Sequence, residues 1–339
     1  MTSLLDVRDL RVTYRTGRHQ DIPAVRGVDL SLDPGSTFGL AGESGSGKST
    51  VALALLRLLP ATARITGQIL LEGEDVLTMR WGHLRTVRWA GASVVFQWAM
   101  HSLNPVRRIG DQIAEPLELH GITEGARTTA RVRELLTQVG LPPSRARDHP
   151  HQLSGGQRQR VMIAMALACD PRLIVSDEAT TALDVMIQAQ ILDLLRSLVT
   201  ERGIGMLMIS HDLSVLAATC DRVGVMYAGR VVEEGPAAQV VHEPAHPYAG
   251  ALSAAFPRIG DPASRLAPQG LAGDPPDPTD PPSGCVFRPR CPVSEKVCAT
   301  VDPPLWPVDP DENGVSERWA ACVHVGPAVP TSAIDDARP

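Results

Sequence analysis

The sequence predicts an α/β fold in which a mixed β-sheet core carries a phosphate-binding loop. Residues 42–50 match the pattern G-x-x-x-x-G-K-[ST] without a mismatch. The apolar segment 37–41 before the loop predicts a strand, and the apolar segment 51–56 after it predicts a helix that Pro60 ends. A strand, a glycine-rich loop and a helix in this order are typical of a nucleotide-binding α/β domain.

Each part of this loop has an expected role in binding a nucleotide. Its glycines let the backbone turn successive N–H groups toward phosphate oxygens, and the helix N-terminus adds positive potential. Lys48 is expected to reach the β- and γ-phosphates, and the Ser49 hydroxyl is expected to ligate Mg²⁺. The nucleotide-binding residues expected in the loop are Gly42, Ser44, Gly45, Ser46, Gly47, Lys48, Ser49 and Thr50.

Composition and charge limit the classes of function. The chain has 339 residues, of which 43% are hydrophobic, and a net charge of −6. The acidic balance argues against a nucleic-acid-binding protein and against binding to anionic lipid through a basic patch. The N-terminus lacks the pattern of a signal peptide and no apolar run reaches the length of a membrane span, so we expect a cytosolic protein. In that reducing compartment the six cysteines are expected as thiols or metal ligands, with Cys169 and Cys220 as small core residues.

Residues 1–256 are expected to form the nucleotide-binding domain. Alternating apolar residues before Asp33 predict two or three antiparallel strands. Tyr14 lies near the end of an early strand, and the pattern alone favours an ordinary strand aromatic. The apolar segments that predict further strands are 67–73, 93–96, 173–176 and 206–210.

A helical insert is predicted between about residues 99 and 156. Apolar residues recur there at helical spacing, broken by Gly121, Gly140 and two prolines. Near the end of the insert Ser154 precedes two glycines, so it is a predicted helix N-cap. The backbone N–H groups of these glycines, which no side chain covers, could bind a second anion.

Polar residues directly follow the predicted buried strands. These residues are Gln97, the pair Asp177 and Glu178, and His211. In open α/β sheets, ligands bind outside the carboxyl ends of the strands. We therefore expect these side chains and the phosphate-binding loop to converge on one edge of the sheet.

The composition changes in the C-terminal part of the chain. Residues 257–283 are rich in proline and predict a linker or an extended strap. Residues 284–325 hold four cysteines, with Trp306 and Trp319 as the only large apolar anchors, and predict a segment that needs a metal to fold. Residues 326–339 are expected to form a disordered tail.

Taken together, these motifs resemble, in order and spacing, those of ABC transporter ATPases. The resemblance covers about residues 3–256 and implies an ABC-type nucleotide-binding domain with a mixed-sheet core, an antiparallel β subdomain and a helical insert. The residues that carry it are 42–50, Gln97, 153–157, 177–178, 183–184 and His211.

Three further stretches resemble one branch of that family. Residues 102–105 and 244–248 look like the peptide/nickel importer branch, and residues 284–292 are similar to the tail of oligopeptide and dipeptide importer ATPases. Two positions depart from the family pattern. Residues 98–101 replace an acidic residue and a proline often found after Gln97, and Ala179 replaces a proline often found after the catalytic glutamate.

The resemblance implies roles for individual residues. An aromatic residue at the Tyr14 position stacks on adenine in that family, which reverses the interpretation from pattern alone. Glu178 is implied as the general base, and His211 as a contact to the γ-phosphate. Mg²⁺ is implied to bind Ser49, Gln97 and Asp177. The residues implied to bind the γ-phosphate of the ATP held by the facing subunit are Ser154, Gly155, Gly156 and Gln157. Asp184 is implied as a further nucleotide-binding residue.

The function implied by the resemblance is that of the ATP-hydrolysing subunit of an importer for di- and oligopeptides. Its implied partners are a second, distinct ABC ATPase chain, two transmembrane permease subunits and, indirectly, an extracytoplasmic binding protein, without nucleic acid. It would act at the cytoplasmic face of the plasma membrane. Import of oligosaccharides or nickel by the same machinery is the alternative, and a soluble ABC ATPase of DNA repair or translation is a remote one. A redox enzyme centred on the cysteines is disfavoured by the complete ATPase motif set.

The four cysteines Cys285, Cys291, Cys298 and Cys322 are expected to bind one metal centre. Ligation by sulfur alone indicates zinc or iron–sulfur. Zinc sites usually contain close cysteine pairs, and the intervals here, of five, six and twenty-three residues, contain none. Together with the resemblance to peptide-importer tails, this spacing favours a 4Fe–4S cluster with a structural role over Zn²⁺.

Overall fold

The computed structural model describes residues 3–15, 21–96, 102–179, 183–255 and 271–327. The chain forms two compact units, each assembled from several stretches of sequence. The first unit consists of Met1–Asp6, Ser31–Thr37 and Ile69–Ile209, and the second of Val7–Leu30, Phe38–Gln68 and Ser210–Pro339. The α/β class predicted from the sequence is confirmed. In the part of the chain that the structure describes, no helix is both long and apolar enough to cross a bilayer.

Three parallel strands form the centre of the first unit. They are β6 (Ala92–Val95), β7 (Leu173–Asp177) and β8 (Gly205–Ser210), in the order β8-β7-β6. All five residues of β7 are buried, as expected for a parallel strand that is covered on both faces. The three strands predicted in this part of the sequence are therefore confirmed.

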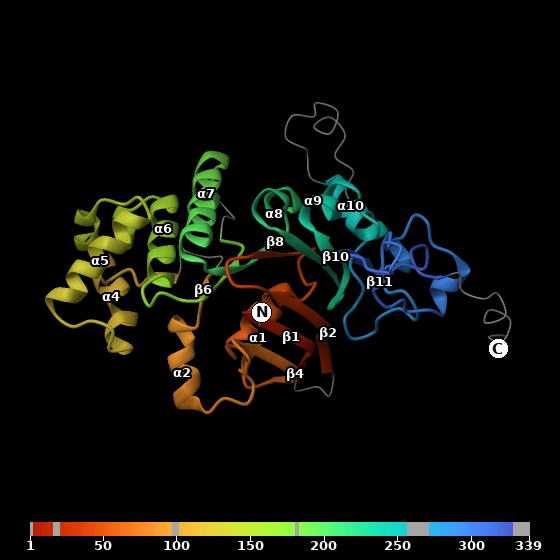
Figure 1. Cartoon of the computed structure of the whole chain (residues 1–339), viewed down its shortest axis with the longest axis horizontal. Helices are drawn as coiled ribbons and strands as arrows, with labels where there is room; N and C mark the ends of the chain where they lie inside the picture. Colours follow the sequence, from red (N-terminus) through yellow and green to blue (C-terminus); the bar gives the residue numbers. More distant parts are fainter. Residues whose placement is uncertain (1–2, 16–20, 97–101, 180–182, 256–270, 328–339) are drawn as a thin grey trace. The chain divides into compact units, whose positions relative to one another are not determined.

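Helices surround these strands, and two of them form the predicted insert. The helices and the short strand of this unit are α2 (Trp81–Ala90), α4 (Ile109–Leu119), α5 (Ala126–Gln138), α6 (Gly155–Ala166), α7 (Val185–Arg202), the 3₁₀ helices η1 (Pro143–Arg147) and η2 (Pro150–Gln152), and β5 (Glu74–Asp75). Helices α4 and α5 contact each other and α6 (Figure 1). Ile113, Leu117, Val132 and Leu136 are buried along this contact, which confirms the helical spacing seen in the sequence.

The second unit contains two groups of strands. Most of β1 (Leu5–Arg15), β2 (Asp21–Leu32) and β4 (Ala63–Leu71) belongs to it, in the order β2-β1-β4. The other group runs in the order β11-β12-β10-β9-β3, with these bounds: β3 (Thr37–Ala41), β9 (Arg222–Tyr227), β10 (Arg230–Pro236), β11 (Trp306–Pro307) and β12 (Trp319–Ala320). Strand β3 pairs with β9 in parallel, whereas the pairs beyond β9 are antiparallel.

The C-terminal segment shares this second group of strands. Strand β12 pairs with β10, so it covers an edge that would otherwise present unpaired backbone groups. The helices of this unit are α1 (Lys48–Leu55), α8 (Leu213–Thr219), α9 (Ala237–His242), α10 (Pro247–Ala255), η3 (Arg288–Arg290) and η4 (Lys296–Ala299). The core interpretation of Cys169 and Cys220 is confirmed, because both are buried.

The expectation that Trp306 and Trp319 are the only large apolar anchors of the C-terminal segment is wrong. Both indoles are partly exposed, and the main anchor is Phe287, which is 2% exposed. Its ring lies 5.2 Å from that of Tyr227 and 5.4 Å from that of Tyr248. The sequence pattern missed this anchor because Phe287 lies in a cysteine-rich stretch without apolar periodicity.

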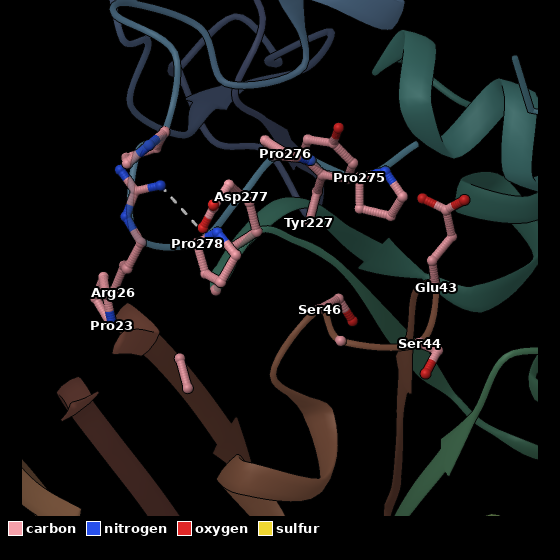
Figure 2. Close-up of a pocket in the computed structure, with 15 residues that line it drawn as sticks. Pro23, Arg26, Glu43, Ser44, Ser46, Tyr227, Pro275, Pro276, Asp277 and Pro278 are labelled. Atoms are coloured by element: carbon pink, nitrogen blue, oxygen red, sulfur yellow. Dashed lines mark hydrogen bonds between the residues drawn. The ribbon is translucent and has the colours of Figure 1, made fainter. Parts of the chain in front are cut away.

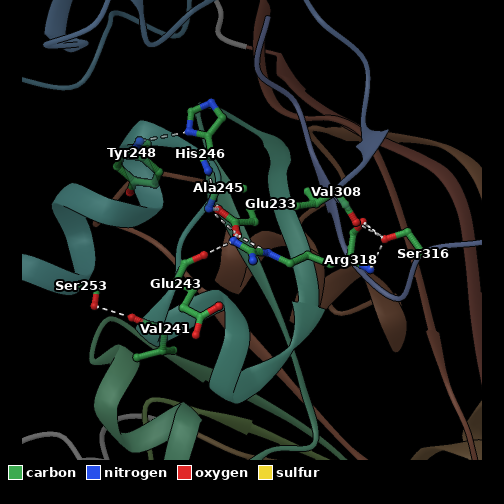
Figure 3. Close-up of polar contacts among 10 residues, drawn as sticks. All are labelled: Glu233, Val241, Glu243, Ala245, His246, Tyr248, Ser253, Val308, Ser316 and Arg318. Atoms are coloured by element: carbon green, nitrogen blue, oxygen red, sulfur yellow. Dashed lines mark hydrogen bonds and ion pairs between the residues drawn. The ribbon is translucent and has the colours of Figure 1, made fainter. Parts of the chain in front are cut away.

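A buried ion pair joins the C-terminal segment to β10 (Figure 3). Arg318 donates from Nε and Nη2 to one carboxylate oxygen of Glu233, at 3.0 and 2.8 Å. Glu233 is fully buried and also accepts hydrogen bonds from the backbone N–H groups of Ala245 and His246. Arg318 donates further to the carbonyl of Glu243. The Glu233 carboxylate and the Arg318 guanidinium therefore both have hydrogen-bond partners besides each other, which a buried ion pair requires.

Replacing Arg318 by methionine should destabilise the protein. The variant leaves the Glu233 carboxylate buried without its counter-ion, a change that typically costs about 3–5 kcal/mol. Urea denaturation measures the free energy of unfolding. The matched control is Asp302→Asn, which breaks the more exposed pair between Asp302 and Arg230 and should cost about 1 kcal/mol or less. Equal stability of the two variants would contradict the role given to the buried pair.

His246 should make stability depend on pH. Burial lowers the pKa of this imidazole to about 4, while its Nδ1 accepts a hydrogen bond from the Tyr248 N–H at 3.0 Å. The unfolded chain therefore binds a proton on this histidine at a higher pH than the folded chain does. Stability from the neutral ring is present above the unfolded pKa, near 6.5, and is lost as pH falls toward the folded value.

The expected loss between about pH 8 and about pH 5 is roughly 2 kcal/mol for this group. Comparing urea denaturation of the wild type and His246→Gln at the two pH values isolates it. The variant should show a shallower decrease in stability with falling pH than the wild type. An unchanged pH dependence in His246→Gln would refute the assignment.

Candidate functional site

The phosphate-binding loop has the backbone that its glycines predict. Gly42 and Gly47 have φ values of 147° and 105°, which residues with a side chain rarely adopt. A Cβ on Gly42 would lie 2.3 Å from the carbonyl oxygen of Met226, and one on Gly47 would lie 2.4 Å from that of Ala24. The loop is therefore pressed against neighbouring backbone, and these two positions admit only glycine.

The loop is wrapped around the ammonium group of Lys48. Nζ donates to the carbonyl oxygens of Gly42 and Glu43, at 2.7 and 2.8 Å, and to the Ser46 hydroxyl at 3.2 Å. Lys48 is 5% exposed, so its charge lies beneath the loop rather than in solvent. A phosphate group bound in the loop would be attracted to this fixed charge.

Helix α1 begins within the loop motif, at Lys48. Its N-cap Gly47 supplies no side-chain hydrogen bond, and its first turn contains no acidic residue. The N-terminal N–H groups of a helix lack intrahelical partners, and together with the helix dipole they favour an anion. This end of α1 is therefore suited to phosphate.

Tyr14 lies beside the same helix. Its hydroxyl is 3.2 Å from the hydroxyl of Thr50 in the first turn of α1. Because the phenol is only partly buried, its ring is available near the nucleotide loop. This position accords with the adenine contact implied for Tyr14, which remains a prediction.

In the first unit, two carboxylates lie at the carboxyl end of β7. Asp177 is the last residue of that strand and is buried, and Glu178 follows it. Glu178 has a φ of 48°, which is strained for a residue with a side chain, and its N–H donates to the Ile209 carbonyl at 3.0 Å. Strain of this kind is concentrated at functional sites, where the surrounding structure must hold it.

The Leu-Ser-Gly-Gly-Gln stretch begins helix α6, and the predicted N-cap at Ser154 is confirmed. The Ser154 hydroxyl accepts from the Gln157 N–H, and the Gln157 side chain accepts from the Ser154 N–H at 3.1 Å, forming a capping box. A Cβ on Gly156 would lie 2.5 Å from Cγ2 of Ile187, so this glycine lets α6 approach α7 closely.

Asp184 has a structural role that the motif did not indicate. Its carboxylate caps α7 by accepting from the Ile187 N–H at 3.0 Å. An N-cap aspartate can be recognised in a sequence only when the start of the helix is known. Here Asp184 was interpreted only as part of the family motif at residues 183–184.

The predicted site residues fall into two groups, one in each unit. Tyr14, the loop and the exposed His211 belong to the second unit, whereas Asp177, Glu178, Asp184 and the signature stretch belong to the first. Gln97 and the departing residues 98–101 lie outside the described residues. The expected convergence of all these groups on one sheet edge therefore stays a prediction.

The four cysteines of the C-terminal segment line one cavity, together with His246 and His324. Its volume is about 10 Å³, which holds about one water molecule. Burial, followed by the charge of neighbouring thiolates, raises the pKa values of three of the thiols, those of Cys285, Cys291 and Cys322. Among the described residues, no three or more histidine, cysteine or acidic side chains are arranged as ligands of one metal ion. The donor set thus suits a soft metal, but the cavity as it stands is too narrow for a cluster.

Three residues of the site were missed by the sequence reasoning: Glu43, Tyr248 and Arg290. Glu43 occupies a variable position of the loop motif, and the other two lie about 200 and 250 residues away. Tyr248 and Arg290 lie in the stretches 244–248 and 284–292 that resemble peptide-importer ATPases, but no local pattern marks them as contacts of the loop, since these contacts exist only in the folded unit.

Comparison with known proteins identifies the family. Residues 25–181 match the model of the ABC transporter family, and residues 232–298 match that of the oligopeptide/dipeptide transporter C-terminal region. A putative peptide import ATP-binding protein of Brucella ovis is 44% identical over 330 residues, covering 93% of this chain and 97% of its own. The oligopeptide transport ATP-binding protein OppD of Escherichia coli K12 is 44% identical over 303 residues, covering 89% of each chain.

Solved structures agree with the sequence comparisons. The ATP-binding cassette MJ0796, in a dimeric post-hydrolysis state bound to ADP and Pi, has a TM-score of 0.62 at 29% identity and covers 69% of this chain and 98% of its own. The cbiO1 protein of Clostridium perfringens has a TM-score of 0.61 at 27% identity and covers 72% of this chain and 92% of its own. With the loop, the signature helix and the C-terminal region all present, this chain belongs to the ATP-binding proteins of the ABC transporter family.

Proposed function

We propose that the chain is the ATP-hydrolysing subunit of an ABC importer that takes up di- and oligopeptides. The observation that carries the proposal is the combination of the loop wrapped around Lys48 with a C-terminal region of the oligopeptide/dipeptide type. The relatives named as peptide import proteins match along nearly their whole length, which supports the same substrate class here.

In the proposed reaction, the loop and the N-terminus of α1 bind the phosphates of ATP. The buried Lys48 ammonium exchanges some of its contacts with loop oxygens for contacts with the β- and γ-phosphates. The Ser49 hydroxyl and the Asp177 carboxylate are oxygen donors of the kind that Mg²⁺ prefers, and Gln97 would complete the set. When bound, Mg²⁺ neutralises charge on the phosphate oxygens.

Glu178 is the proposed general base. It orients the attacking water and accepts its proton while the γ-phosphate is transferred. Its position supports the assignment, because Glu178 directly follows Asp177, a proposed Mg²⁺ ligand, at the carboxyl end of the buried strand β7. His211 is proposed to contact the γ-phosphate.

A facing ATPase subunit completes each nucleotide site in this proposal. Ser154, Gly155, Gly156 and Gln157 would contact the ATP held by the facing subunit, and Asp184 is proposed as a further nucleotide-binding residue. The N-terminus of α6 lies at this stretch, which supports an anion contact there. The dimeric, nucleotide-bound state of MJ0796 supports such a pairing. The partner is proposed to be a distinct chain, and two permease subunits would hold the pair at the cytoplasmic face of the plasma membrane.

The four C-terminal cysteines are proposed to hold a metal centre, with a 4Fe–4S cluster favoured over Zn²⁺. The lining of one cavity by all four thiols supports a shared site. The raised pKa values of Cys285, Cys291 and Cys322 mean that a metal must displace protons to bind.

Glu178→Gln should abolish hydrolysis while ATP binding is retained. The amide keeps the shape of the side chain but cannot accept a proton, and loss of a general base costs about 10²- to 10⁴-fold in rate. ATPase activity is measured on the complex purified with its partners, and uptake of a labelled tripeptide is measured in cells. Glu201→Gln, at an exposed position of α7, should leave both activities unchanged. Near-normal hydrolysis in Glu178→Gln would refute the role of the base, and normal hydrolysis without tripeptide uptake in the wild type would refute the substrate class.

Anaerobically purified protein should contain about four iron atoms and matching sulfide per chain, as expected for a 4Fe–4S cluster. Cys298→Ala should lose this metal, because the cavity loses one of its four thiols. Cys220→Ala, a buried cysteine of the same unit away from the cavity, should retain it. One zinc and no iron would refute the cluster, and absence of any metal would refute the site.

A further inference from the structure

Glu43, the second residue of the phosphate-binding loop, is held from three directions within the second unit. Its carbonyl oxygen accepts from Lys48 Nζ at 2.8 Å, and its N–H donates to the hydroxyl of Tyr248 at 2.9 Å. Its carboxylate is paired with Arg290 of the C-terminal segment. This residue therefore links the ammonium beneath the loop to a segment far along the sequence.

The contact between Arg290 and Glu43 is a bidentate ion pair. Nη1 and Nη2 of Arg290 donate to the two carboxylate oxygens of Glu43 at 2.7 and 3.0 Å. The Arg290 side chain is 5% exposed, so the pair is largely shielded from water. Paired N–H donors that match a carboxylate fix orientation as well as distance, which a single lysine charge does not.

Arg290 is itself held in place by its surroundings. Its Nε donates to the carbonyl of Ala272 at 2.9 Å, and its guanidinium lies 5.8 Å from the centre of the Tyr227 ring. The pKa of this guanidinium is raised above its usual value, chiefly by the hydrogen bonds to Glu43. Each of the three guanidinium nitrogens thus donates a hydrogen bond, and none of these contacts belongs to the strand pairing of the C-terminal segment.

The aromatic residues behind this contact are tightly packed. Tyr248 is fully buried, and its ring lies 4.5 Å from that of Tyr227 and 5.4 Å from that of Phe287. Phe287 is the N-cap of the 3₁₀ helix η3 (Arg288–Arg290), which carries Arg290. The position of the guanidinium therefore follows from the packing of this cluster.

The described part of the proline-rich stretch, which begins at residue 271, lies against the same loop at residues 275–278 (Figure 2). One cavity of about 50 Å³ is lined by Glu43, Ser44 and Ser46 of the loop and by the stretch 275–278. Arg290 thus links Glu43 of the loop to the carbonyl of Ala272, three residues before the stretch that lines the cavity.

We propose that Arg290 is a positioning residue for ATP binding, which acts by holding Glu43 and thereby the conformation of the phosphate-binding loop. A glycine-rich loop has many conformations of similar energy, and an external tie reduces the number that must be given up on binding. The proposal rests on the proposed ATPase function and extends it, because it gives the C-terminal segment a direct part in nucleotide affinity.

The test is a nucleotide titration of the full-length chain with a fluorescent ATP analogue. Arg290→Met removes the charge and the fork, and Arg290→Lys keeps the charge but loses the bidentate geometry. Glu43→Gln removes the other charge of the same ion pair. It therefore tests the proposal even if the Arg290 variants fail to fold. Asp302→Asn is the matched control, because it breaks another ion pair of the same segment, with Arg230, that does not contact the loop.

We expect ATP affinity to fall on the order of tenfold in Arg290→Met, the size typical of coupling between two sites, and by less in Arg290→Lys. Glu43→Gln combined with Arg290→Met should bind no more weakly than the weaker single variant, because both remove the same tie. In the assembled complex, turnover at saturating ATP should stay within about twofold of the wild type while KM rises. Asp302→Asn should bind ATP normally.

Unchanged affinity in a folded Arg290→Met variant, additive losses in the double variant, or an equal loss in Asp302→Asn would overturn the proposal. Failure of the wild-type chain to bind ATP would instead overturn the proposed function. The two failures are therefore distinguishable in one series of titrations.

Discussion

The ammonium group of Lys48 is the feature on which the nucleotide loop depends. A buried charge is costly unless hydrogen bonds replace its water, and here two carbonyl oxygens and a hydroxyl do so. The backbone can present those oxygens only if Gly42 and Gly47 adopt positive φ angles. The same curl places the loop so close to the backbone of Ala24 and Met226 that no side chain fits. The conformation that surrounds Lys48 and the close packing against neighbouring backbone thus both require glycine at positions 42 and 47.

Motif residues of the first unit also combine two functions. Ser154 and Gln157 form a capping box that begins α6, and Gly156 allows the close approach of α7. Asp184 caps α7. A substitution in these motifs would therefore disturb helix ends or helix packing as well as any contact with a nucleotide, so a loss of activity in such a variant does not by itself identify a ligand contact.

The C-terminal segment is integrated into the second unit by three kinds of contact. Strand β12 pairs with the edge of β10, the buried pair of Arg318 and Glu233 fixes that pairing, and Phe287 anchors an aromatic cluster. These contacts together place Arg290 next to the loop. The segment has few apolar residues of its own, and it gains a core by sharing that of its neighbours, which explains why a separate hydrophobic pattern is missing from its sequence.

The sequence by itself determined the class of fold, the phosphate-binding loop, and the strands that precede Gln97, Asp177 and His211. These features depend on short local patterns of residues. It also determined the helix start at Ser154, since a capping box is a local signal. Tertiary structure alone decided that Phe287 rather than the two tryptophans is the anchor, and that Asp184 caps a helix.

Only the folded chain brings Glu43, Tyr248 and Arg290 together across more than 200 residues of sequence. Arginine and tyrosine are common surface residues, and nothing in their immediate neighbours marks these two as partners of the loop. The ion pair is specified by strand pairing and aromatic packing that no short pattern encodes. The contact between the C-terminal segment and the nucleotide loop is therefore a property of tertiary structure.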